Sequence, residues 1–80
     1  MTDSPAGTLA AAPIGTRARI VELSGEDSLV QRLLEMGLTE GEEIEVVRHA
    51  PLGDPIEIHI RGYNLSLRRS EATSVIIETL

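Results

Sequence analysis

The feature that most constrains the fold is a strict alternation at residues 56–61. Isoleucine occupies positions 56, 58 and 60, and Glu, His and Arg occupy positions 57, 59 and 61. A side-chain period of two places the isoleucines on one face of a β-strand and the polar residues on the other. Weaker versions of this pattern predict further strands at residues 17–23, 42–49, 65–68 and 74–78. Short strands at this spacing predict a small antiparallel sheet that curls into a barrel.

A different periodicity predicts one amphipathic helix at residues 27–36. Four apolar residues fall at the spacing i, i+1, i+4 and i+5 of a single stripe: Leu29, Val30, Leu33 and Leu34. Gly37 is typical of the left-handed residue that ends many helices. We expect the helix to close one open end of the barrel, because its leucine stripe has no other apolar surface to cover. A single helical turn is expected at residues 70–72, and a short turn at residues 62–64.

Length and composition predict the domain organisation. Residues 1–8 are small and polar, and we expect a disordered N-terminal tail there. Residues 9–80 then form a single domain, since a chain of 80 residues has material for only one core. The predicted fold class is mainly β with one helix, as a small antiparallel barrel with an inserted amphipathic helix.

Composition excludes several classes of function. The chain contains no cysteine, which excludes disulfides, thiolate metal sites and cysteine nucleophiles and favours a reducing compartment. Its net charge is -6, with no lysine and with seven arginines against thirteen acids. That balance argues against nucleic acid and anionic membrane surfaces as partners. No apolar run approaches the roughly 20 residues that span a bilayer, and the N-terminus does not resemble a signal peptide. We therefore expect a cytoplasmic protein.

The two histidines, His49 and His59, are candidate metal ligands. If the strands on either side of residues 50–55 pair through their inward residues, Glu45 lies opposite His59 on the outer face. His49 is then four residues along from Glu45, about 13 Å away, so that the two histidines do not share one ion. Glu45 and His59 alone make a poor site. We interpret them as an exposed cross-strand charge pair.

The remaining chemistry also favours a protein that is not an enzyme. A dense acidic run, Glu40, Glu42, Glu43 and Glu45, is compatible with a hard-cation or iron site, but we favour a solvated sheet edge that discourages edge pairing. No serine has an evident base near it, and no glycine-rich phosphate loop is present. The sequence therefore predicts no catalytic, cofactor-binding or metal-ligating residue.

The loop at residues 50–55 is the best candidate for a binding site. Prolines at positions 51 and 55 restrict it, so that ordering it on a partner costs little entropy. Leu52 lies at its tip, either as an exposed partner contact or folded back to cap the barrel. Arg61, Arg68 and Arg69 form a local basic cluster, either a docking point for an acidic partner or solvated charge. The predicted partner-binding residues are Pro51, Leu52, Gly53, Asp54, Arg68 and Arg69.

Three segments together resemble the FeoA family of small proteins. They read LLEMGL at 33–38 followed by Gly41, APLGDPI at 50–56, and LSLRRSEA at 65–72. The resemblance extends from about residue 9 to residue 78. It implies an SH3-like barrel with an inserted helix, in agreement with the strand and helix patterns.

The same resemblance implies a partner. FeoA proteins act beside FeoB, a membrane ferrous-iron transporter with a cytoplasmic GTPase domain, and the accessory would bind its cytoplasmic part and influence assembly or nucleotide turnover. Similar domains form the C-terminal module of iron-dependent repressors, but this chain has no room for a DNA-binding helix-turn-helix. The alternative is a small metal-sensing or metal-carrying protein, which two separated histidines and no cysteine disfavour. An open barrel edge would also permit weak self-association.

Overall fold

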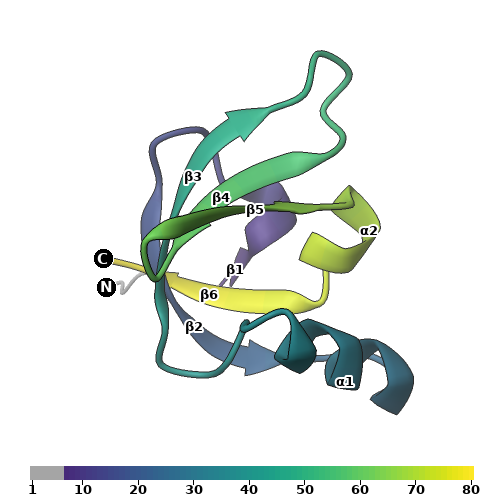
Figure 1. Ribbon diagram of the computed structural model, residues 1–80. Helices are drawn as coiled ribbons and strands as arrows, with labels where there is room; N and C mark the ends of the chain where they lie inside the picture. The colour runs from purple at the N-terminus through teal and green to yellow at the C-terminus, as the bar shows by residue number, and fades with distance from the viewer. Residues whose placement is uncertain (1–6) are drawn as a thin grey trace.

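The computed structural model describes residues 7–80, which form one curled antiparallel sheet with three short helices (Figure 1). The six strands lie in the order β1-β6-β2-β3-β4-β5. Their bounds are Gly7–Thr8 for β1, Arg17–Leu23 for β2, Glu43–His49 for β3, Ile56–Ile60 for β4, Tyr63–Leu67 for β5 and Val75–Thr79 for β6. The helices are the 3-10 helix η1 (Leu9–Ala11), α1 (Asp27–Glu35) and α2 (Arg69–Ala72).

This architecture confirms the predicted fold class. The protein is mainly β, and α1 is inserted between β2 and β3. Within residues 7–80, β1 and β5 are the two edges of the sheet and do not pair with each other. The acidic strand β3 instead lies between β2 and β4, so our interpretation of its glutamates as edge protection is wrong. They lie on a central strand, where Glu43 is 3.8 Å from the guanidinium of Arg19 on the neighbouring β2.

The core lies on the concave face of the sheet, as the alternation predicts. The register places Ile44 opposite Ile60 and Val46 opposite Ile58, which confirms the expected β3–β4 pairing. The largest side chains with almost no exposed surface come from both ends of the chain and from every strand but β1: Leu9, Ile20, Leu33, Leu38, Val46, Ile56, Ile58, Ile60, Leu67 and Val75. A core without Phe or Trp therefore depends on the interlocking of branched aliphatic side chains.

The helix α1 covers the core with a narrower stripe than the sequence predicts. Leu33 is fully buried and Leu29 is partly buried, but Leu34 keeps 39% of its surface exposed. Gly37 has φ +97°, as predicted for a left-handed helix end. The hydroxyl of Tyr63 on β5 donates a hydrogen bond to the carbonyl of Met36 (3.1 Å), which ties the end of α1 to the sheet.

Two predicted boundaries are wrong. The tail was expected to reach residue 8, but Gly7 and Thr8 pair with β6, which gives these residues a place in the sheet; residues 1–6 lie outside the described part of the chain. The turn expected at residues 62–64 lies one residue earlier, because Arg61 and Gly62 both adopt positive φ and Tyr63 already belongs to β5. No helix within residues 7–80 has the length and apolar character needed to cross a membrane.

Candidate protein-binding site

The loop between β3 and β4 is tightly closed and projects from the end of both strands (Figure 1). The amide of Ala50 donates to the carbonyl of Pro55 (3.0 Å), and the amide of Gly53 donates to the carbonyl of Ala50 (2.7 Å). The peptide bond between Asp54 and Pro55 is cis. Leu52 at the tip has 96% of its surface exposed, so the alternative in which it folds back to cap the barrel is wrong.

Arg69 holds this loop against the rest of the protein. Its backbone amide donates to Asp54 Oδ1 (2.9 Å), and its Nε donates to the carbonyl of Gly53 (3.2 Å). Its Nη1 donates to the carbonyl of Ala10 in η1 (2.8 Å). A single side chain at the start of α2 therefore joins the loop, α2 and η1. Two of the predicted site residues, Asp54 and Arg69, thus hold the loop in place through four hydrogen-bonding groups. In this way they fix the position of Leu52.

The predicted basic cluster is only partly assembled. Arg61 lies at the turn between β4 and β5, at the opposite end of β5 from Arg68, and it is 3.6 Å from Glu42. Five residues of strand separate the two arginines by about 17 Å. Only Arg68 and Arg69 lie near the loop, and no ion pair of either is found within residues 7–80. Arg61 is therefore not part of the site.

A cavity of about 440 Å³ lies below the loop, between the sheet and α1. Its lining residues are Arg32 and Met36 from α1, Asp54 and Pro55 from the loop, Ser66 and Leu67 from β5, and Arg68 and Glu71 around α2. Two of the predicted site residues, Asp54 and Arg68, thus lie on the wall of one cavity. Its lining combines three apolar residues, Met36, Pro55 and Leu67, with charged ones, and such a mixture is typical of a surface that takes a side chain of a partner.

Two residues of this cavity were missed by sequence reasoning. Glu71 is only 7% exposed, and its Oε1 accepts a hydrogen bond from the backbone amide of Arg68 (2.9 Å). Its Oε2 lies 2.8 Å from Nη2 of Arg32, which comes from the distant helix α1. A buried carboxylate is stable when it is paired and hydrogen-bonded in this way. The spacing of three residues between Arg68 and Glu71 predicts the hydrogen bond between them. The ion pair with Arg32 cannot be predicted from residues close to Glu71 in the sequence.

His59 occupies the position expected of it, whereas a register shift between Val46 and Arg48 places His49 opposite the buried Ile56. Glu45 lies opposite His59 in the β3–β4 register, as predicted. His59 Nδ1 is 2.7 Å from Asn64 Oδ1, and Asn64 Nδ2 donates to Glu57 Oε2 (2.9 Å). These contacts form a polar network across the outer face of β4 and β5. Among residues 7–80, no group of three or more His, Asp or Glu side chains is placed to hold a metal ion.

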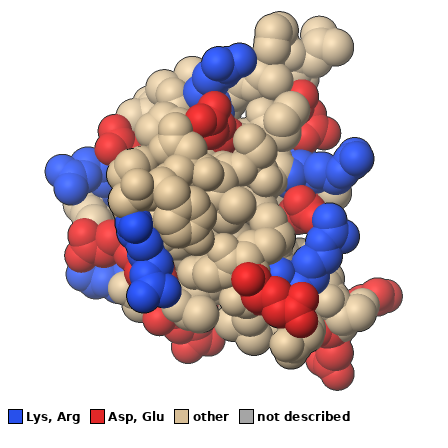
Figure 2. All heavy atoms as spheres, viewed as in Figure 1, with Lys and Arg blue, Asp and Glu red and all other residues tan. Residues whose placement is uncertain are grey.

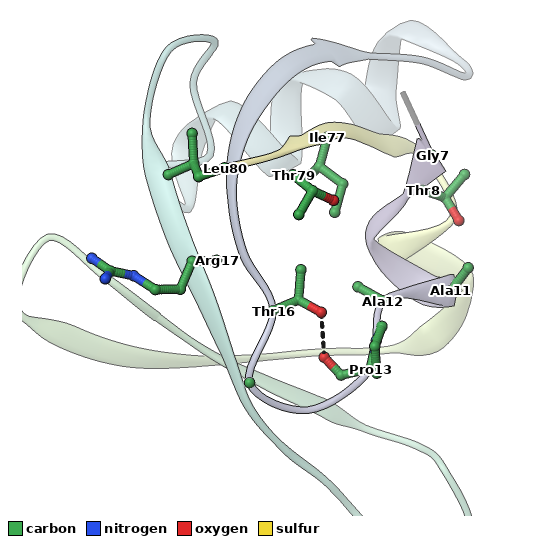
Figure 3. Close-up of a pocket in the computed structure, with 11 residues that line it drawn as sticks. Gly7, Thr8, Ala11, Ala12, Pro13, Thr16, Arg17, Ile77, Thr79 and Leu80 are labelled. Carbon is green, nitrogen blue, oxygen red and sulfur yellow. Dashed lines mark hydrogen bonds between the residues drawn. The ribbon is translucent and has the colours of Figure 1, made fainter. Parts of the chain in front are cut away.

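A second hollow, of about 560 Å³, lies near the chain ends (Figure 3). It is bounded by η1, the turn that follows it and β6, and Thr16 Oγ1 donates to the carbonyl of Pro13 (2.7 Å) at its rim. Arg17 is its one charged lining residue, and Figure 3 shows that side chain directed away from the other labelled residues. No His, Asp or Glu within the described residues lines this hollow.

Comparison with known proteins identifies the family. The model of the FeoA domain matches residues 7–79. This chain belongs to the FeoA family. It is 42% identical over 66 residues to the Fe(2+) transport protein A/Fe(2+) transporter FeoB fusion protein of Porphyromonas gingivalis strain W83, a match that covers 82% of this chain. The chain spans only 8% of the length of that fusion protein.

Solved structures of FeoA-family proteins have the same fold. The FeoA-like protein of Clostridium acetobutylicum is 35% identical and superposes with a TM-score of 0.89, over 100% of this chain and 91% of that one. The FeoA of Stenotrophomonas maltophilia in complex with zinc, described as a prokaryotic SH3 domain protein, is 32% identical. It superposes with a TM-score of 0.71 over 89% of this chain and 88% of that one. The fold of this FeoA-family protein is therefore SH3-like, as the resemblance implied.

Proposed function

We propose that this protein is a cytoplasmic, non-enzymatic accessory of ferrous-iron uptake that binds the cytoplasmic part of a FeoB-type transporter. In this role it modulates assembly of the transporter or its GTPase activity. The observation that carries the proposal is the Porphyromonas gingivalis relative, in which FeoA and FeoB are parts of one fusion protein. A fused domain is held at high effective concentration beside its neighbour, which favours a contact between them even when the free components bind weakly.

The loop at residues 50–55 is the contact surface of this proposal. Leu52 supplies a large apolar side chain with almost its whole surface free to be covered. Because Arg69 and Asp54 already hold the loop in place, little conformational entropy is lost when a partner covers Leu52. Asp54 within the loop and Arg68 beside it are the polar rim residues of this surface, with Pro51 and Gly53 setting the backbone of the loop.

The test is retention of a detergent-solubilised FeoB-type transporter on the immobilised protein and its Leu52→Asp variant. We expect the variant to lose at least about tenfold in affinity, since burying an unpaired carboxylate in an apolar contact is costly. Thermal unfolding of the variant is expected to match the wild type, because Leu52 makes no core contact. Ile14→Asp is the matched control, as Ile14 is another exposed apolar residue outside the loop. Equal binding by Leu52→Asp and wild type would rule out the loop as the contact.

A metal-carrying role is the second proposal, because the Stenotrophomonas maltophilia relative was solved with zinc. Glu45 and His59 are the pair in this chain with ligand chemistry and cross-strand placement. Two ligands leave most of the coordination shell to water, which gives weak binding. Anaerobic calorimetric titration with ferrous iron decides between the two roles. Stoichiometric binding tighter than about 1 μM, lost in His59→Ala, would favour the carrier, and heats equal to dilution would eliminate it.

A further inference from the structure

The strand β5 has an open edge with unpaired backbone groups. Arg61 and Gly62 form a two-residue hairpin turn in which both φ angles are positive (53° and 88°), as in a type I′ turn. The residues that flank such a turn, Ile60 and Tyr63, form a hydrogen-bonded pair. Alternation along the strand then directs the backbone groups of Leu65 toward β4, and those of Asn64 and Ser66 toward the free edge.

Nothing in the described chain covers that edge. Within residues 7–80, the backbone of neither Asn64 nor Ser66 forms a hydrogen bond outside the sheet ladder. β5 is also the last strand of the sheet. Its free edge therefore offers two N–H donors and two C=O acceptors to another extended chain.

β5 lacks the features that usually prevent another strand from pairing with an exposed sheet edge. Natural sheets protect their edges with proline, with lysine or other charges, or with a very short strand. β5 has five residues, Tyr63–Leu67, and contains neither proline nor a charged residue. Figure 2 shows an uncharged surface over β5, with basic and acidic side chains around it. The opposite edge, β1, differs because it is only two residues long.

The cavity below the loop at residues 50–55 continues from this edge. Ser66 lines the cavity from the sheet, and Arg32 and Met36 line it from α1. A strand added to the free edge of β5 extends the sheet toward α1. Alternate side chains of the added strand then enter the cavity, which is how strand addition combines backbone affinity with side-chain selectivity.

The hydrogen-bond donors and acceptors that line the cavity indicate which kind of partner side chain it can bind. Among the carboxylate oxygens, Glu71 Oε1 accepts from the backbone amide of Arg68, Glu71 Oε2 is ion-paired with Arg32, and Asp54 Oδ1 accepts from the backbone amide of Arg69. The donors are in surplus, because the guanidinium of Arg32 carries five N–H groups, Glu71 is its ion-pair partner among the described residues, and its side chain is 63% exposed. No hydrogen bond or ion pair of the Arg68 guanidinium is found among the described residues. An acidic side chain is the group that satisfies these donors.

We propose that the free edge of β5 binds an extended segment of a partner protein as an added antiparallel or parallel strand, with an acidic side chain of that segment seated between Arg32 and Arg68. This surface is continuous with the loop that carries Leu52, since Asp54 and Pro55 belong to both. The inference deepens the proposed function and rests on it for the identity of the partner. The chemistry of the segment rests only on the edge and the cavity.

The test uses random ten-residue peptides displayed on phage and selected on the wild-type protein, so that it needs no transporter. We expect the selected peptides to share Asp or Glu flanked by alternating apolar residues. Their affinity is expected to fall at least about tenfold for Arg68→Gln, the scale of one hydrogen bond between charged groups, while Arg48→Gln on β3 binds as the wild type. Ser66→Pro removes an edge N–H that faces solvent and is expected to abolish binding, whereas Ser66→Thr retains it.

Amide hydrogen exchange on the wild-type protein supplies a readout that does not depend on the folding of any variant. A selected peptide is expected to protect the amides of Asn64 and Ser66 at least about tenfold, while that of Leu65, already paired with β4, changes little. Selection of basic peptides, failure to select any peptide, or unchanged exchange at Asn64 and Ser66 would overturn the proposal. Protection of these amides that rises with protein concentration alone would also overturn it, because a second copy of the chain would then occupy the edge.

Discussion

Replacing Arg69 by alanine is expected to release the loop at residues 50–55 from the rest of the protein. The substitution removes the bonds from Nε to the carbonyl of Gly53 (3.2 Å) and from Nη1 to the carbonyl of Ala10 (2.8 Å). The backbone amide of Arg69 still donates to Asp54, so one attachment remains. Each lost bond has a net contribution of about 1 kcal/mol, which gives a loss of about 2 kcal/mol in the free energy of unfolding. For a domain of this size that lowers Tm by about 8–16 °C.

Urea unfolding followed by far-UV circular dichroism measures this loss. Arg68→Ala is the matched control, because it removes the adjacent arginine, whose guanidinium forms no bond within residues 7–80, and it is expected to change stability by less than about 0.5 kcal/mol. Arg69→Lys keeps the charge but not the fork of donors, and is expected to resemble Arg69→Ala. Equal stability of Arg69→Ala and Arg68→Ala would refute the reasoning that Arg69 holds the loop.

Two further predictions concern α1 and its end. Gly37→Ala is expected to destabilise by about 2 kcal/mol, since it combines a positive φ with a Cβ only 2.8 Å from the hydroxyl of Tyr63. Gly41→Ala is the control: it has a similar φ but nothing within 4 Å, and is expected to cost only about 1 kcal/mol. Leu33→Ala is expected to cost about 2–5 kcal/mol because the side chain is fully buried, and Leu34→Ala less than about 1 kcal/mol because its side chain is 39% exposed. Chemical denaturation of each pair tests these differences, and equal losses within either pair would contradict the assigned environments.

Much of the sheet was predictable because strand register depends on local alternation. The isoleucines at positions 56, 58 and 60 specify which face of β4 is buried, and the inward residues of β3 then select their partners. The sequence predicted the loop at residues 50–55 but left open whether Leu52 is exposed or folds back on the barrel, and the structure decides for exposure. The turn before Tyr63 was misplaced, since a positive φ at Arg61 is not suggested by its residue type.

The sequence by itself determined the class of fold, the position of the helix and the position of the loop at residues 50–55, because each depends on neighbours within a few residues along the chain. Only the tertiary structure decided that Arg69 braces the loop, that Arg32 neutralises Glu71, and that β5 rather than β3 lies at an edge of the sheet. These features join segments separated by up to 59 residues. Such contacts depend on how the whole sheet curls, and the curl of the sheet cannot be predicted from the periodicity of the sequence.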